Sequence, residues 1–492
     1  MSEQQSSYRQ IMKATSLFGG VQVFNIIISI IRSKVVAVLL GPAGIGILGL
    51  INSTIGLIGA LTNFGLGTSA VKDIAAANNC ENTERISTIT TIFRRLVWFT
   101  GTLGALVTLI FSPWLSQLTF GNKEYTFAFI WVSITLLFAQ LSSGQLVILQ
   151  GMRKLKYLAK ANLIGSGLGL FVTLPFYYFM GIDGIVPGII GTSCISLMLS
   201  WFFSRKVSIP SIYVSRDQTI AESKSMLQMG LMISLSGLLT VGASYIVRIF
   251  ISRTGDLEQV GLYNAGFAII NTYVGLVFTA MATDYYPRLS SVAHDNKLCK
   301  RAINQQSEIA ILVLAPILII FIVFINWVII LLYTKQFLAV NEMIHWAALG
   351  MFFKAASWSI AFIFLAKGAS KLFFWNELIC IVYELALNII GYHLWGLKGL
   401  GLSFAVGYFF YLIQVFIVSK LKFDFSLDRS FITIFAVQLS LAATGLVIIK
   451  LIPQPYTYIV GSVLIIISAW YSIKELDIRL GLINQIKKYR QK

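Results

Sequence analysis

Charged side chains are scarce in this sequence. Only 12% of its 492 residues are Asp, Glu, Lys or Arg, whereas a soluble globular protein has about 25%. Acidic residues are the rarer kind, with 20 Asp and Glu against 38 Lys and Arg. Hydrophobic residues make up 57% of the chain, and its mean hydropathy is +0.79. This composition excludes a soluble globular domain and predicts a membrane protein with many spans.

The motifs of common enzyme chemistries are absent as well. The sequence contains no phosphate-binding Walker A motif, no HExxH and no nucleophile elbow. Its three histidines, His294, His345 and His393, are scattered without the spacing of metal ligands. We therefore expect no metal, no cofactor and no ATP hydrolysis by this chain. A membrane-bound enzyme of glycan synthesis stays open as an alternative, although outer loops of about a dozen residues leave little room for its site.

Long apolar runs dominate what is present. Each run is long enough to cross a bilayer as a helix, and none shows the alternation of an outer-membrane barrel strand. The fourteen segments lie near residues 14–40, 43–66, 88–111, 126–150, 158–180, 184–204, 226–252, 259–283, 308–333, 336–365, 372–394, 399–420, 431–452 and 456–473. We therefore predict an all-α polytopic membrane protein with fourteen transmembrane helices.

The basic residues predict the orientation of these helices. If the N-terminus lies inside the cell, and residues near a segment end are assigned to the nearest side, 29 of the 38 Lys and Arg residues belong to the inner side and five to the outer side; the remaining four, Arg32, Lys34, Arg248 and Lys354, fall inside segments. Such a bias is the positive-inside rule, and it places both termini in the cytoplasm. It also accounts for the net charge of +18 without nucleic acid, because anionic membrane lipids are sufficient partners for basic inner loops.

A division into two lobes follows from an internal repeat. The stretch that begins at Ile30 is similar to the stretch that begins at Tyr245: both have an arginine late in an apolar run, then a turn and a glycine-containing helix. The repeat predicts two pseudo-symmetric six-helix lobes, related by a twofold axis along the membrane normal. We predict an N-terminal lobe (1–204), a cytoplasmic linker (205–225), a C-terminal lobe (226–420) and two further helices with a cytoplasmic tail (421–492).

Polar residues inside the first span are the strongest functional signal. Arg32 and Lys34 lie well within it, and Asn25 precedes them by about two turns. A cation at the centre of a spanning helix costs about 2.5–3.5 kcal/mol on insertion scales, so a cavity or an anionic ligand would explain its presence. The alternative is that the long side chain reaches the interface. Lys34 precedes the predicted Gly41-Pro42 turn by seven residues, which leaves both interpretations open for it.

Further candidates come from the repeat and from the second lobe. Arg248 is the repeat mate of Arg32, and we predict that the two line one central cleft. Asn63 and Asn271 lie on helices rich in small residues, a pattern that suits either close helix packing or a polar cavity wall. Lys354 and Glu384 lie at nearly equal depth on adjacent segments, so we predict an ion pair between them. That pair is either a static bridge or a proton-responsive switch, with Glu384 as the candidate coupling residue.

The opening sequence resembles a known superfamily. The stretch SKVVAVLLGPAGIGILGLINSTIGLIGALTNFGLGTSAVKDIA, from Ser33 to Ala75, is similar to the multidrug/oligosaccharidyl-lipid/polysaccharide (MOP) exporters, and most to their Wzx-type polysaccharide and O-antigen flippases. The resemblance implies a MATE-like fold and alternating access. It also implies that intramembrane cations hold a pyrophosphate, a role that Arg32 matches. Unlike the related lipid II flippases, this chain has no charged residue between Pro42 and Val71.

The resemblance implies a substrate and a location. A flippase of this type moves an undecaprenyl-pyrophosphate-linked oligosaccharide, such as an O-antigen or enterobacterial-common-antigen repeat unit, across the bacterial inner membrane for lipopolysaccharide biosynthesis. It implies a polysaccharide polymerase and a chain-length regulator as partners. A multidrug or small-molecule antiporter of the same fold stays open as an alternative. Such antiporters favour acidic residues in the N-terminal lobe, whereas the charges within its spans are here basic.

Overall fold

The computed structural model describes residues 3–80, 82–210, 212–453 and 455–480, and within these ranges its regular elements are all helices. Nine helical stretches of this part of the chain are long and apolar enough to cross a membrane. The predictions of an all-α fold and of a multi-pass membrane protein are therefore confirmed. The count of fourteen spans stays a prediction.

Three of the nine stretches each contain two of the predicted segments. In Phe24–Asn63 the helix is interrupted at Gly41, where φ is 64°. In Ser370–Phe423 it is interrupted at Gly396, where φ is 56°. Both values lie in the left-handed region that glycine adopts without steric cost, so each glycine ends one helix and starts the next. The third stretch, Leu155–Ser204, passes through the 3₁₀ turn η1, Gly181–Gly184.

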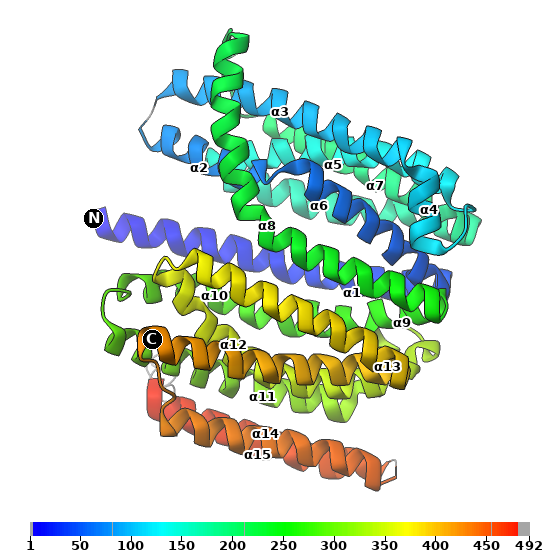
Figure 1. The fold of residues 1–492 in the computed structure, drawn as a ribbon, viewed down its shortest axis with the longest axis vertical. Helices are drawn as coiled ribbons and strands as arrows, with labels where there is room; N and C mark the ends of the chain where they lie inside the picture. The colour runs from blue at the N-terminus through cyan, green and yellow to red at the C-terminus, as the bar shows by residue number, and fades with distance from the viewer. Residues whose placement is uncertain (1–2, 81, 211, 454, 481–492) are drawn as a thin grey trace. The chain divides into compact units, whose positions relative to one another are not determined.

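Contacts divide the chain into two compact units. The first unit comprises Met1–Gly261 with Leu332–Thr334, and the second comprises Leu262–Leu331 with Lys335–Lys492. In chain order the helices of the first unit, drawn in Figure 1, are α1 (Glu3–Asn63), α2 (Leu66–Asn79), α3 (Thr83–Ile110), α4 (Ser112–Phe120), α5 (Thr126–Gly151), α6 (Leu155–Met180), η1, α7 (Ile185–Ser204), α8 (Arg216–Thr254) and the first part of α9 (Leu257–Ala268).

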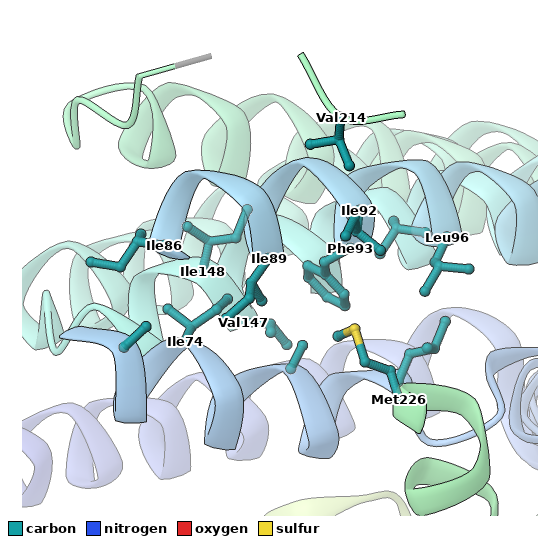
Figure 2. Packing of buried hydrophobic residues seen from close by; sticks show 14 residues of the cluster. Ile74, Ile86, Ile89, Ile92, Phe93, Leu96, Val147, Ile148, Val214 and Met226 are labelled. Carbon is teal, nitrogen blue, oxygen red and sulfur yellow. The ribbon is translucent and has the colours of Figure 1, made fainter. Parts of the chain in front are cut away.

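An apolar cluster in the first unit joins α2, α3 and α5. Figure 2 shows Ile89 and Phe93 of α3 facing Val147 of α5, with Val214 and Met226 packed beside them. Val214 lies in the segment that the sequence predicts to be a linker, and this segment therefore packs on the first unit. The compact unit continues beyond 205–225 to Gly261, whereas the lobes predicted from the repeat remain a prediction.

Two glycines of the internal repeat pack against each other's helices. A Cβ on Gly46 would lie 1.9 Å from the carbonyl oxygen of Leu257, and a Cβ on Gly261 would lie 1.8 Å from that of Pro42. Each carbonyl oxygen belongs to the residue four positions before the opposite glycine, so the contact is reciprocal. The backbones approach closely because neither position has a side chain.

The second unit has its own elements and core. These elements are the rest of α9, the π-helical segment η2 (Ile269–Val274), α10 (Gly275–Ser291), α11 (Asn296–Leu332, whose last residue is in the first unit), η3 (Lys335–Val340), α12 (Asn341–Ala366), α13 (Ser370–Phe423), α14 (Arg429–Leu451) and α15 (Tyr456–Leu480). Tyr285, Ile303, Phe364 and Val415 belong to one buried cluster that joins α10 to α13. The helices α14 and α15 lie side by side (Figure 1). The predicted tail after Leu480 lies outside the described residues.

Candidate functional site

Arg32 lines a small polar pocket inside the first unit. The cavity has a volume of about 270 Å³ and is enclosed by α1, α5, α6 and α7. Its lining is Arg32, Ser142, Leu146, Ala161, Asn162, Gly165, Ser166, Thr192, Ser196 and Ser200. Seven of these ten side chains are polar, which is unusual for the interior of an apolar helix bundle. The pocket is the part of the described chain where intramembrane charge and free polar volume coincide most clearly.

Helical spacing and one glycine explain why these side chains converge. Thr192, Ser196 and Ser200 are four residues apart on α7, so they share one face of that helix. On α6, Gly169 leaves room where a side chain would collide: its Cβ would lie 2.9 Å from Thr192 Cγ2 and 3.4 Å from Arg32 Nη2. The guanidinium of Arg32 therefore packs between α1 and the bare backbone of α6.

Arg32 itself has no hydrogen-bond or ion-pair partner among residues 3–80, 82–210, 212–453 and 455–480. Its side chain is exposed, and the pocket lining contains no carboxylate. The five N–H donors of a guanidinium are thus open to a ligand. The prediction that Arg32 faces a cavity rather than the outer interface agrees with this placement, while its role in substrate binding stays a prediction.

Lys34 lies only two residues from Arg32, but it lines an apolar groove and not the pocket of Arg32. Its Nζ donates a hydrogen bond of 2.5 Å to the backbone carbonyl of Tyr333, a residue of the short 332–334 segment of the same unit. Lys34 also lines an apolar groove of about 600 Å³ between α1 and α6. The groove is otherwise formed by Val35, Val38, Leu39, Phe171, Leu174, Pro175, Tyr178 and Phe179.

The remaining polar candidates of the first unit lie apart from the pocket. Asn25 and Asn63 are half-buried, and the Oδ1 atom of each is buried without a hydrogen-bond partner among the described residues. Arg248 donates from Nη1 to the carbonyl oxygen of Ser244 at 3.0 Å, one turn earlier on α8. Arg248 does not line the pocket of Arg32. A shared central cleft for the two arginines stays a prediction.

The first unit contains a buried network of hydroxyl groups that the sequence did not predict. Tyr245 Oη lies 2.6 Å from Thr119 Oγ1, and Thr54 Oγ1 donates to Tyr245 Oη at 3.2 Å. The three residues come from α8, α4 and α1, so the network joins helices far apart in sequence. Helix α4 lies between the predicted segments 88–111 and 126–150. The sequence could not predict this network, because no pattern of residues indicates that these three hydroxyls lie close together.

In the second unit, Lys354 and Glu384 do not form the predicted ion pair. Lys354 Nζ lies 5.0 Å from the ring centroid of Tyr408 and 5.5 Å from that of Phe404. Glu384 packs against Gly407, where a Cβ would lie 3.4 Å from Glu384 Oε1, and this oxygen is buried without a hydrogen-bond partner among the described residues. The two charges still interact electrostatically. The direct bridge is wrong because the aromatic rings of α13 take the ammonium group instead.

Other polar groups of α13 form hydrogen bonds near its N-terminal half. Glu377, two turns earlier, accepts a hydrogen bond from the hydroxyl of Tyr411. Gln414 Nε2 donates to the side-chain oxygen of Asn376 at 2.7 Å. Asn271 is exposed and lies in the π-helical segment η2. Segments of π-helix are frequent at functional sites, but within the described part of the chain no hydrogen bond or ion pair connects Asn271 with Lys354 or Glu384.

Comparisons with known proteins agree with this architecture. The chain is 19% identical to the lipid III flippase of Escherichia coli (strain K12) over 347 residues, which cover 70% of this chain and 82% of that protein. A solved structure described as an inward-facing multidrug resistance MATE family transporter of the MOP superfamily matches with a TM-score of 0.69, 16% identity, and coverage of 82% of this chain and 94% of that one. The lipid II flippase MurJ in an inward closed conformation matches with a TM-score of 0.67 and 14% identity, and covers 95% of this chain and 99% of that one.

These matches confirm the resemblance to MOP exporters that the sequence suggests, and the fold is MATE-like and MurJ-like. The sequence model of one family, described as polysaccharide biosynthesis protein, matches residues 35–342, which is more than half of the chain. The chain therefore belongs to this polysaccharide biosynthesis protein family.

Proposed function

We propose that this protein is a flippase for a lipid-linked glycan. The observation that carries the proposal is Arg32: an arginine within a spanning helix, without a hydrogen-bond or ion-pair partner among the described residues, beside a polar pocket. The similarity to the E. coli lipid III flippase and the family membership support the same class of substrate.

No protein anion among the described residues neutralises the positive charge of Arg32. An unpaired cation in low dielectric is costly unless an anion or water solvates it. A pyrophosphate needs donors and positive charge, and a guanidinium supplies bidentate hydrogen bonds to phosphate oxygens. Arg32 therefore suits a lipid pyrophosphate better than a neutral lipid or a cationic drug. We propose that Lys34 and Arg248 add positive charge near the passing pyrophosphate, and that Asn25, Asn63 and Asn271 add polar contacts.

The finer proposal concerns substrate and direction. We propose an undecaprenyl-pyrophosphate-linked oligosaccharide of O-antigen type, moved by alternating access from the inner to the outer leaflet of the bacterial inner membrane. Fourteen spans and cytoplasmic termini accompany this proposal, because the bias of basic residues favours both. A polysaccharide polymerase and a chain-length regulator are the proposed partners, since they would use the flipped lipid.

The apolar groove beside Lys34 suits the lipid tail of such a substrate. Exposed faces of Phe171, Tyr178 and Phe179 line it, and Lys34 places an ammonium group at its wall. An isoprenoid chain is apolar and flexible, and it would cover this surface while its pyrophosphate stays near the cations of α1. Glu384 is the proposed coupling residue, because Oε1 of its carboxylate is buried without a hydrogen-bond partner among the described residues.

A deletion strain tests the function. Without the protein, the lipid-linked oligosaccharide should accumulate on the inner leaflet, and a plasmid copy should restore its export. Failure to make the intermediate at all would instead indicate an enzyme of glycan synthesis. Normal export of every glycan together with loss of drug resistance would indicate an antiporter of the same fold. The last outcome is disfavoured by the basic pocket, because drug antiporters usually bind cations.

A further inference from the structure

We propose that the pocket beside Arg32 binds one sugar ring of the transported glycan, rather than the pyrophosphate alone. This inference rests on the proposed function, which it extends from the lipid pyrophosphate to the saccharide. It follows from a count of hydrogen-bond donors and acceptors along the pocket wall, which a bare anion does not match and a polyol does.

Three hydroxyls of the pocket donate their protons to backbone carbonyls and are therefore not free to donate to a ligand. Ser142 Oγ donates to the carbonyl of Ser196 at 3.1 Å, Thr192 Oγ1 donates to that of Gly188 at 2.6 Å, and Ser200 Oγ donates to that of Leu197 at 3.0 Å. A hydroxyl has one donor and two acceptor lone pairs, so these oxygens present acceptors to the cavity. Phosphate oxygens are acceptors too, and they would meet lone pairs there unless the hydroxyls gave up their backbone bonds.

Other groups in the same pocket keep donors. Arg32, Asn162, Ser166 and Ser196 have no side-chain hydrogen-bond partner within the part of the chain that the structure describes. The amide of Asn162 offers both donors and an acceptor, and the guanidinium of Arg32 offers donors only. The cavity thus presents both acceptors and donors. Each hydroxyl of a sugar ring is itself donor and acceptor, so a pyranose can satisfy both kinds of wall at once.

Size and apolar contacts point to a single ring. The volume of about 270 Å³ is slightly below the range of about 300–1,000 Å³ for drug-sized ligands, so it does not accommodate an oligosaccharide. Leu146, Ala161 and Gly165 supply an apolar patch for the C–H face of a ring. Because the five N–H donors of Arg32 point outward along different edges of its planar guanidinium, it can bond a sugar hydroxyl and a neighbouring phosphate together.

Saturation-transfer NMR on the full-length protein in lipid nanodiscs tests this assignment. The probes are methyl glycosides of common hexoses and N-acetylhexosamines, each measured alone, with inorganic pyrophosphate observed by ³¹P line broadening. At least one glycoside should receive saturation from the protein. The double variant Thr192→Val and Ser196→Ala removes two pocket hydroxyls and should weaken binding of that glycoside about tenfold. Ser193→Ala on the same helix lies outside the lining and should leave binding unchanged.

Three outcomes would overturn the sugar pocket. No glycoside binds to the wild-type protein; binding survives the double variant although its thermal unfolding matches that of Ser193→Ala; or pyrophosphate alone binds and is lost in the double variant. The flippase proposal is tested separately by inner-leaflet accumulation in the deletion strain. If the double variant flips normally and binds the glycoside as the wild type does, only the sugar-pocket proposal is wrong. If the protein binds a glycoside but its deletion leaves glycan export intact, the flippase proposal is wrong and the sugar pocket stands.

Discussion

Two arginines of this molecule, Arg32 in the first unit and Arg479 in the second, are in opposite situations. Arg479 near the end of α15 has a partner for each of its guanidinium nitrogens: Nε contacts Glu308 at 2.6 Å, Nη1 contacts Glu475 at 2.5 Å, and Nη2 donates to Ser430 Oγ at 2.7 Å. These contacts tie α15 to α11 and α14. Arg32 has no such partner among the described residues, although it lies within an apolar span.

We expect this difference to separate a structural arginine from a functional one. When the partners of a charge all lie within the protein, removing that charge leaves another buried charge unpaired and destabilises the fold. A charge without protein partners raises the free energy of the fold and is retained when a ligand uses it. Substitution of Arg479 should therefore affect stability, and substitution of Arg32 should affect transport.

The largest effect is expected for Arg32→Glu. Reversing the charge should abolish glycan export, because a carboxylate beside the pocket repels a pyrophosphate and offers it no donors. The amount of protein in the membrane should stay unchanged, since no hydrogen bond or ion pair of Arg32 with a described residue is lost. Export assays with immunoblotting measure both quantities. Arg32→Lys is the matched control and should keep part of the activity. Normal export in Arg32→Glu would remove this residue from the site.

A stability effect is expected for Arg479→Ala. Glu308 is only 10% exposed, and loss of its partner should destabilise the protein by about 3 kcal/mol. The thermal unfolding temperature in detergent should fall, while the transport per folded molecule is retained. Arg479→Lys should recover part of the loss, because it restores the charge without the guanidinium fork. An unchanged unfolding temperature in Arg479→Ala would contradict the structural role.

A smaller effect is expected for Gly169→Ala, which leaves Arg32 in place but narrows the space around its guanidinium. The added Cβ would lie 2.9 Å from Thr192 Cγ2 and 3.4 Å from Arg32 Nη2, so α7 or the guanidinium must shift. We expect a destabilisation of about 1 kcal/mol and a several-fold decrease in transport. Gly167→Ala on the same helix is the control, because its Cβ meets only Ile28 Cδ1 at 3.9 Å. Equal transport by the two variants would show that the pocket tolerates displacement of Arg32.

The smallest change in rate is expected for Glu384→Gln. Glutamine has the same shape but cannot titrate, so transport at neutral pH should be largely retained while its dependence on pH is lost. Transport measured in vesicles across a range of pH, with unchanged protein level, tests this expectation. The groups that interact with Glu384 are Lys354, Glu377 and Cys380, so Glu377→Gln serves as the neighbouring control. A pH profile that Glu384→Gln leaves intact would restrict Glu384 to a structural role.

The sequence by itself determined the class of the molecule. Its scarce charge and long apolar runs predicted a multi-pass helical protein, and Gly41 marked one helix break because few other residues adopt a positive φ. The stretch after Ser33 indicated the resemblance to MOP exporters. Arg32 was found without a structure, because a cation in an apolar run is costly wherever the chain folds.

Only the tertiary structure decided what each polar side chain meets. Helical spacing placed Thr192, Ser196 and Ser200 on one face, yet their convergence with Ser142, Asn162 and Arg32 depends on how three other helices pack. The equal depth of Lys354 and Glu384 along their helices predicted that the two residues would lie near each other. It could not predict that the ammonium group of Lys354 would lie over the ring of Tyr408. Depth along a helix follows from rise per residue, whereas the direction of a side chain depends on neighbours that are distant in sequence.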